Sequence, residues 1–181
     1  MSMAERKSLH PLLALRTSPA AFDHAHELSR DDVEALLNAA RWAPSAGNSQ
    51  PWAFIVALRG DLPHQELVVH LAASSGRWAP YASALIVNLA HVHVEGTDWQ
   101  FSDFSRYDLG QAVAYMTFQA AALGLAIRQF RAFDQQGIAT AFDVPAHWEV
   151  TSMSAIGRPL SDSSASRSRT RRSIEDVVWK R

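Results

Sequence analysis

The chain of 181 residues contains no cysteine and no long hydrophobic run, and each absence excludes a class of protein. Without cysteine there is no disulfide framework, no thiolate metal site and no cysteine nucleophile. No apolar run approaches the roughly 18 residues of a membrane span, and residues 1–7 lack the apolar core of a secretory signal. We therefore expect a cytoplasmic protein that makes no contact with a membrane.

Several common site motifs are also absent. The sequence has no G-x-G-x-x-G, no P-loop and no G-x-S-x-G, which removes the usual dinucleotide, nucleoside-triphosphate and hydrolase sites. His91 and His93 lie two residues apart on an expected strand and so would share a face, but no further ligand stands at a telling spacing, and we expect no metal site. His24 and His26 lie in a polar loop, where we expect them to be solvated.

The formal net charge of -1 argues against bulk electrostatic binding to nucleic acid, but the charge is unevenly placed. Residues 158–181 carry seven basic and three acidic side chains, so the rest of the chain is net acidic. The basic residues include four arginines in a serine-rich stretch: Arg167, Arg169, Arg171 and Arg172. This stretch is either a solvated tail or an arginine grip on a phosphate, whose oxygens match the guanidinium fork.

The length and the 48% hydrophobic content predict one domain over residues 1–181, with residues 158–181 as a basic C-terminal extension. Hydrophobic spacing, helix caps and chain breakers predict alternating helices and strands. The expected helices are Leu28–Trp42, Leu62–Ala73, Tyr107–Leu123 and Asp134–Phe142, and the expected strands are Trp52–Leu58, Ala84–Val94, Leu125–Phe130 and Val150–Ile156. This order indicates an α+β or α/β sandwich, a central sheet covered by helices.

The segment RWAPSAGNSQPW, residues 41–52, holds the densest group of polar side chains between two rigid elements. Functional side chains often lie on such a loop, and asparagine and glutamine offer the donor and acceptor pair that suits the edge of a heterocycle. The alternative is a capped turn whose amides satisfy their own backbone.

With Arg16-Thr17-Ser18 upstream, the loop sequence APSAGNSQPW resembles that of the FMN-dependent nitroreductase family. The resemblance continues through YDLGQAVAYMTFQAAALGL, RQFRAFD with AFDVPAHW, AIGRP and RTRRSIEDVVW, and so covers roughly residues 9–180 in the family's order. Each motif is weakly specific, but five in order are a strong signal.

The resemblance implies an α+β three-layer sandwich with a central, mainly antiparallel sheet, and a homodimer whose C-terminal extension packs on the partner. It implies two FMN sites at the subunit interface and a ping-pong cycle, in which NAD(P)H reduces the flavin and a nitroaromatic, quinone or similar small acceptor reoxidises it. The hydride chemistry then belongs to the cofactor, which explains why the sequence shows no acid–base dyad.

The resemblance also assigns residues to the site, with no catalytic side chain among them. The expected flavin contacts are the phosphate and ring-edge residues Arg16, Thr17 and Ser18, the partner-side residues Pro44, Ser45, Ala46, Asn48 and Gln50, the N5-side backbone of Gln129, Phe130, Arg131 and Ala132, and the phosphate-binding Arg169 and Arg171. The aromatic stretch expected to cover the flavin or its entrance is Trp99, Phe101, Phe104 and Tyr107.

The sequence departs from the family pattern in two places. Ala20 stands where many relatives have a second basic residue, and Arg131 and Ala132 stand where relatives often have glycine. The Arg131 side chain is expected either to face the substrate or the phosphate of NADPH, or to lie in solvent or pair with Asp134. Two other functions stay open: a flavin-binding or storage protein without efficient turnover, and, more weakly, a basic-tailed nucleic-acid binder.

Overall fold

The computed structural model describes residues 9–160 and 169–179. Its sheet has four strands in the order β1-β2-β4-β3, and all three pairings are antiparallel. The strands are β1 (Trp52–Leu58), β2 (Ala84–His91), β3 (Ala126–Phe130) and β4 (Trp148–Gly157). The expected antiparallel sheet is therefore confirmed.

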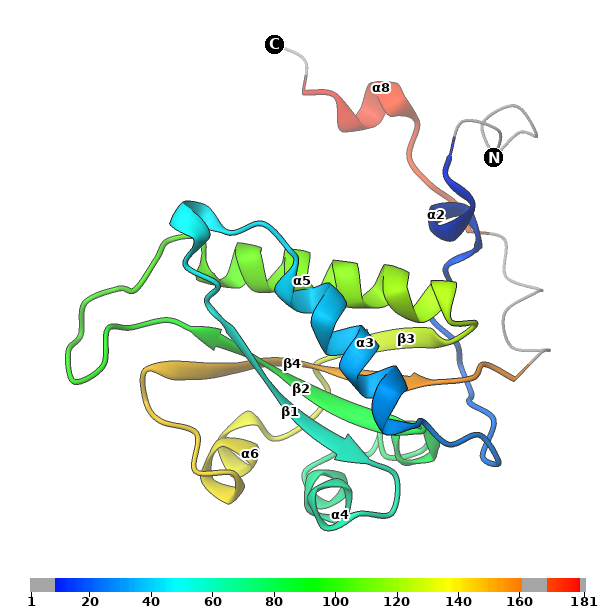
Figure 1. Ribbon diagram of the computed structural model, residues 1–181, viewed down its shortest axis with the longest axis horizontal. Coiled ribbons are helices and arrows are strands. Elements are labelled where there is room, and N and C mark those ends of the chain that lie inside the picture. Colours follow the sequence, from blue (N-terminus) through cyan, green and yellow to red (C-terminus); the bar gives the residue numbers. More distant parts are fainter. Residues whose placement is uncertain (1–8, 161–168, 180–181) are drawn as a thin grey trace.

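Helices cover both faces of this sheet (Figure 1). The α-helices are α2 (Pro11–Leu15), α3 (Arg30–Arg41), α4 (Leu62–Val69), α5 (Ser105–Ala122), α6 (Gln135–Ala141) and α8 (Ile174–Val177), with short 3-10 turns η1 (Ala46–Asn48) and η2 (Ala79–Tyr81). α3 and α5 pack on one face and α4 and α6 on the other, while α2 and α8 project beyond α5 (Figure 1). The predicted α+β sandwich of helix, sheet and helix layers is thus observed.

Two large hydrophobic clusters, one on each face of the sheet, and a smaller third one hold the layers together. On the α5 face, Leu36 of α3 and Met116 of α5 pack against Ile86 and Ile156 of the sheet. On the opposite face the buried residues include Leu67 of α4 and Ile138 of α6, together with Met153 of β4. Strand alternation accounts for this division, because successive side chains of a strand point to opposite faces.

α5 is the longest described helix, and among the described residues no helix is both long and apolar enough to cross a membrane. It ends at Ala122, and Gly124, two residues later, has a φ of 72°, the left-handed conformation that glycine adopts freely after a helix. α5 exposes apolar side chains on the side away from the sheet, including Tyr107 at 66% and Tyr115 at 42% exposure. A helix that is apolar on all sides needs a second packing partner.

Several predicted boundaries shift by one to four residues, including α3, which spans Arg30–Arg41 rather than Leu28–Trp42, and α5, which begins at Ser105 rather than Tyr107. α4 ends at Val69 rather than Ala73, and turns follow it. β2 ends at His91 rather than Val94, because the amides of Val92 and His93 both donate to the carbonyl of His147 instead of to a strand. β4 begins earlier than predicted, at Trp148, where it pairs with His91.

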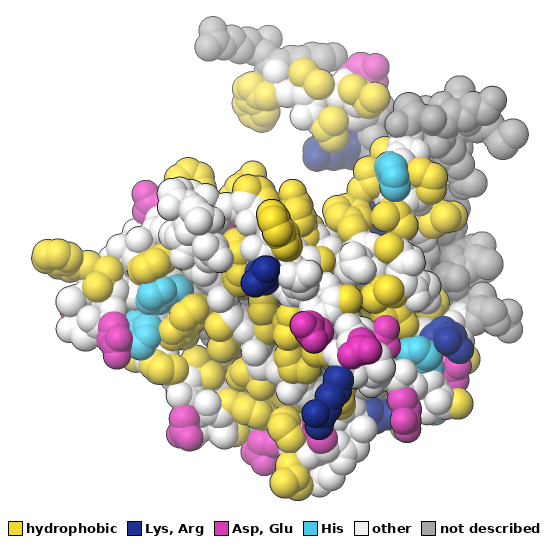
Figure 2. Space-filling model, in the orientation of Figure 1, with side chains coloured by type: hydrophobic (Ala, Val, Ile, Leu, Met, Phe, Trp, Pro, Cys, Tyr) yellow, Lys and Arg dark blue, Asp and Glu magenta, His cyan; other side chains and the backbone are white. Residues whose placement is uncertain are grey.

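α2 and α8 are short helices that the hydrophobic pattern did not predict. Their capping residues are visible in the sequence. His10, just before Pro11, accepts a hydrogen bond from the Leu12 amide through its side chain, and Ser173 and Asp176 form a capping box at the start of α8. α8 and the residues after it expose Ile174, Val177, Val178 and Trp179, the last at 92%. Hydrophobic side chains gather over α2 and α8 at the top of Figure 2.

Candidate functional site

A cavity of about 280 Å³ opens beside the middle of α5, and it brings three of the predicted residues together. Arg16, Ser18 and Gln129 line it together with Ile127 of β3 and three residues of α5, namely Ala114, Thr117 and Phe118. One end is cationic and polar, and the wall is apolar. This arrangement suits a ligand with an anionic end and a flat hydrocarbon body.

Three arginines from the two ends of the chain meet at the cationic end; we call Arg16, Arg169 and Arg171 the arginine cluster. The Arg16 guanidinium donates to the Ser18 hydroxyl at 3.2 Å, and Arg169 donates to the backbone carbonyls of Ala14 and Arg16. Burial and the charges of Arg169 and Arg171 lower the pKa of Arg16.

Within residues 9–160 and 169–179, no carboxylate lies within ion-pair distance of the arginine cluster. Three guanidinium groups that repel one another without an acidic partner favour the binding of an anion, and planar forks match phosphate oxygens in geometry. Thr17 lies half-buried beside this group, and Ala20 is exposed and supplies no charge. The serine-rich stretch has two further arginines. Arg172 is exposed, and Arg167 lies outside the described residues.

The loop of residues 44–50 lies at the N-terminal end of α5, away from the cavity. The backbone φ is positive at Gly47 (60°), Asn48 (55°) and Gln50 (47°), a conformation that costs free energy for residues other than glycine. The Gln50 amide side chain donates to the carbonyl and the side-chain oxygen of Asn48, both at 3.3 Å. These two side chains therefore satisfy each other, as the capped-turn alternative predicts, while the loop itself stays exposed.

A buried carboxylate holds this loop to α5. Asp108, 2% exposed, accepts the Ala46 amide at 3.0 Å and the Gln111 side-chain amide at 3.2 Å. The same Gln111 amide reaches the Pro44 carbonyl at 3.5 Å. Thus Pro44, Ser45 and Ala46 have a fixed backbone, although none of them lines the cavity of its own chain.

The two groups of predicted residues are consequently separated along α5. Asp108 marks the loop end and Thr117 the cavity end, and nine residues at about 1.5 Å each place them about 14 Å apart. One chain on its own does not bring Pro44–Gln50 to Arg16, Ser18 and Gln129.

Residues 129–132 run from the cavity past the end of β3. Gln129 lines the cavity, whereas Phe130 points to the other face and packs edge-on against Trp78 and Phe133. Among the loop hydrogen bonds of the described residues, none is donated by the amide of Arg131 or Ala132. These backbone N–H groups are therefore available to a ligand. Arg131 and Ala132 stand where relatives often have glycine, and both residues keep the backbone N–H that a glycine would offer.

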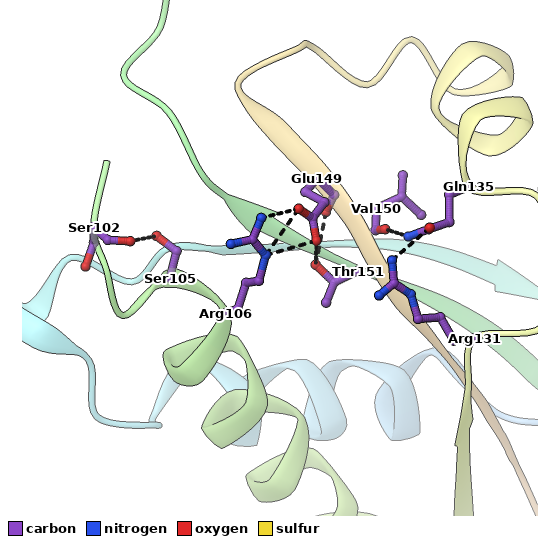
Figure 3. Close-up of polar contacts among 8 residues, drawn as sticks. All are labelled: Ser102, Ser105, Arg106, Arg131, Gln135, Glu149, Val150 and Thr151. Atoms are coloured by element: carbon purple, nitrogen blue, oxygen red, sulfur yellow. Dashed lines mark hydrogen bonds and ion pairs between the residues drawn. The ribbon is translucent and has the colours of Figure 1, made fainter. Parts of the chain in front are cut away.

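Two separate groups of polar contacts involve the neighbouring β4 residues Glu149 and Val150 (Figure 3). Arg106 of α5 forms a two-pronged ion pair with Glu149 of β4, and this pairing lowers the pKa of the Glu149 carboxyl. The Arg131 guanidinium donates to Gln135 at 2.8 Å rather than to Asp134, and the Gln135 amide donates to the Val150 carbonyl.

The aromatic stretch begins on a hairpin after β2, formed by the Val94 and Trp99 and the Val92 and Phe101 backbone pairs, and continues into the first turn of α5, where Tyr107 lies. Phe101 turns inward and stacks on His91 at 3.8 Å between ring centres. Trp99 is 76% exposed, and Phe104 and Tyr107 are 54% and 66% exposed. The stretch therefore divides into one packed residue and three residues that face outward.

The histidines differ from expectation. His26 is half-buried, and its Nδ1 lies 2.9 Å from the Ser83 hydroxyl, so the prediction of a solvated side chain is wrong for His26. His24 is exposed but stacks on Tyr81. The described residues contain no group of three histidine or acidic side chains that could hold a metal ion. Burial lowers the pKa values of three histidines: His26, His64 and His91.

Sequence reasoning missed Asp108, Gln111, Thr117 and Gln135. Asp108 and Gln111 lie in YDLGQAV, a segment that belongs to the family resemblance but carries no predicted site residue except Tyr107, and an acidic residue in a first helical turn is an ordinary sequence feature. Nothing in the sequence indicates that this carboxylate is bonded to a backbone amide 62 positions earlier.

Comparisons with known proteins agree with this geometry. The sequence model of the Nitroreductase family matches residues 13–71. A 5,6-dimethylbenzimidazole synthase of Rhodospirillum rubrum is 28% identical over 157 residues, 75% of this chain and 74% of that protein. An oxygen-insensitive NADPH nitroreductase of Helicobacter pylori is 34% identical over 65 residues, 36% of this chain and 31% of that protein. A solved structure described as an oxidoreductase containing FMN superposes with a TM-score of 0.85 at 29% identity, covering 95% of this chain and 91% of the other.

Proposed function

Since the chain belongs to the nitroreductase family, we propose that it is an FMN-dependent oxidoreductase that passes hydride from NAD(P)H to a small acceptor in a ping-pong cycle. The acceptor would be a nitroaromatic, a quinone or a similar compound. The observation that carries the proposal is the arginine cluster at one end of a cavity whose other wall is Gln129 and the apolar side of α5. Bound flavin supplies the hydride chemistry, and the protein supplies binding and orientation.

The residues of the cavity fit FMN by charge and by shape. A phosphate monoester carries nearly two negative charges, and the cluster offers three cations with no acidic partner among the described residues. Arg16 and Arg169 are already oriented, by Ser18 and by backbone carbonyls, so little side-chain freedom is lost on binding. The unbonded amides of Arg131 and Ala132 would donate to the ring edge at N5, with Gln129 beside them.

A second copy of the chain would complete the site. The cavity of about 280 Å³ falls just short of the roughly 300–1,000 Å³ of typical ligand pockets. The 44–50 loop is exposed and held at the opposite end of α5, where a partner's cavity would meet it. The apolar outer side of α5 and the exposed side chains of α8 would form the dimer interface.

The exposed aromatic side chains Trp99, Phe104 and Tyr107 would cover the entrance to the flavin. Trp99 lies on a hairpin that begins where β2 ends, and Phe104 and Tyr107 lie at the start of α5, so all three could take such a role without disturbing the sheet. If so, Trp99→Ala raises the Michaelis constant for acceptors, and unchanged constants for every acceptor would assign the stretch to surface packing.

The purified protein tests the proposal directly. We expect a yellow homodimer with about one FMN per chain, whose flavin absorbance is bleached anaerobically by NADH or NADPH and restored by an acceptor. A colourless protein that takes up no FMN, or a monomer by light scattering, would contradict it. Flavin that binds but is not reduced by either nicotinamide would indicate a storage protein.

A second candidate reaction is the formation of 5,6-dimethylbenzimidazole, because a synthase of that name aligns with three quarters of the chain. The two candidates differ in the fate of the flavin. Analysis of the products by liquid chromatography distinguishes them: an oxidoreductase retains its FMN through many turnovers, whereas a flavin-consuming reaction loses it as the product accumulates.

A further inference from the structure

Arg131 is a cation that is held in one orientation but not neutralised. Its guanidinium donates to the Gln135 side-chain oxygen, and Gln135 is fixed in turn by its own bond to the Val150 carbonyl (Figure 3). In the described part of the chain no carboxylate lies within ion-pair distance of Arg131. The remaining N–H groups of this exposed guanidinium are therefore held in place without a hydrogen-bond partner among the described residues.

The position of Arg131 relates it to the cavity. It follows Gln129 by two residues and lies one residue beyond the end of β3 at Phe130. The Arg131 charge also lowers the pKa of the Glu149 carboxyl, which is bonded to Arg106, so Arg131 lies near the end of the sheet where α5 begins. From Arg106 to Thr117, α5 extends about 17 Å, so Arg131 lies toward the end of the site opposite to the arginine cluster.

The neighbouring acid does not cancel this charge, because Glu149 is engaged by Arg106 through two nitrogen atoms. Two guanidinium groups thus flank one carboxylate, and the group as a whole is cationic. A ligand anion that reaches Arg131 gains a charge-assisted hydrogen bond without first displacing an internal ion pair.

We propose that Arg131 binds an anionic group, a carboxylate or a phosphate, of a substrate that approaches the flavin, and that it selects anionic substrates over neutral ones. The inference rests on the proposed function for the identity of the site. The anion has two sources: an acceptor that carries a carboxylate, or the 2′-phosphate of NADPH.

The first experiment measures binding alone, with benzoate as the anionic probe and benzyl alcohol as its neutral counterpart, by calorimetric titration. Arg131→Gln should weaken benzoate binding roughly threefold to tenfold, the range for an exposed charge-assisted contact, and leave benzyl alcohol unaffected. Arg131→Lys retains the charge and should lose less. Gln135→Glu supplies an internal carboxylate to Arg131 and should weaken benzoate binding while Arg131 stays in place.

Arg30→Gln is the matched control, since it removes one exposed positive charge at the start of α3. Equal benzoate affinity in Arg131→Gln and the parent, or an equal loss in Arg30→Gln, overturns the inference. These titrations do not require turnover, so they judge Arg131 even if the protein proves to take up no FMN and the proposed function fails.

The second experiment identifies the source of the anion. We compare kcat/KM for 4-nitrobenzoate with that for 4-nitrobenzyl alcohol, and kcat/KM for NADPH with that for NADH, in the parent and in Arg131→Gln. A fall in the first ratio assigns Arg131 to the acceptor, and a fall in the second assigns it to the nicotinamide. If neither ratio changes while the parent turns over normally, the inference is wrong and the proposed function stands.

Discussion

Replacement of Arg171 by glutamine should weaken phosphate binding without weakening the fold. The Arg171 side chain is exposed, and the bond it makes is to the carbonyl of its own neighbour Thr170, at 3.0 Å. Its charge nevertheless lowers the pKa of Arg16. In the absence of an anion Arg171 therefore adds repulsion to the cluster, and we expect the free energy of unfolding to stay within about 0.5 kcal/mol of the parent.

The loss of affinity can be worked from the same geometry. A hydrogen bond to a charged group contributes about 1.5–3 kcal/mol, and the exposure of Arg171 places it at the lower end of that range. Since about 1.4 kcal/mol corresponds to a factor of ten, FMN affinity should fall about tenfold. Arg169 is a less clean probe, because it also holds the Ala14 and Arg16 carbonyls and its removal would loosen the N-terminal segment.

Quenching of FMN fluorescence on titration with protein measures the affinity, and a thermal shift with inorganic phosphate reports on the cluster alone. Arg172→Gln is the control: it removes the same charge one residue away, and Arg172 does not contribute to the lowered pKa of Arg16. Equal losses of FMN affinity in the two variants would show that Arg171 acts only through the net charge of the protein. Unchanged affinity in Arg171→Gln would remove Arg171 from the site.

Three further outcomes follow from particular contacts. Asp108→Asn should lower stability by about 1–3 kcal/mol and speed hydrogen exchange at the Ala46 amide, because a buried charged acceptor is lost; unchanged exchange there would show that the loop is held by other bonds. Gly137→Ala should destabilise by about 1–3 kcal/mol in chemical unfolding, against the usual gain of a helical Gly→Ala change, because the new Cβ would overlap the Asp134 carboxylate and lie 2.5 Å from His70 Nδ1. The three histidines whose pKa burial lowers bind fewer protons folded than unfolded, so stability should be complete above about pH 6.5 and fall as the pH drops below it; a flat unfolding free energy between pH 7 and 5 would contradict this.

The sequence predicted the local elements well where side-chain pattern and caps act together. The strand at Trp52–Leu58 has the predicted bounds, and Ser29 caps α3, with Asp32 completing a capping box. The strand predicted to reach Val94 stops early because its length is set by the neighbouring strands, and no local pattern encodes where those strands end.

The candidate site shows the same division. The motif residues Arg16, Ser18 and Gln129 meet at one cavity, and a family pattern can indicate this because it records which residues recur together. The groups that hold the site are different. Asp108 reaches Ala46 and Arg106 reaches Glu149 across 62 and 43 positions of sequence, and such contacts depend on how α5 lies on the sheet.

The separation of the cavity and the 44–50 loop along α5 bears on how the proposed dimer would be built. In an isologous pair the same surface of both copies meets across a two-fold axis. An axis crossing α5 near Val113, midway between Asp108 and Thr117, would run the two α5 helices antiparallel. The 44–50 loop of each copy would then lie beside the cavity of the other, and the exposed Tyr107 and Tyr115 would be covered in the same step. One rotation thus satisfies both the unpartnered side of α5 and the incomplete cavity, whereas a head-to-tail contact would complete at most one of the two sites.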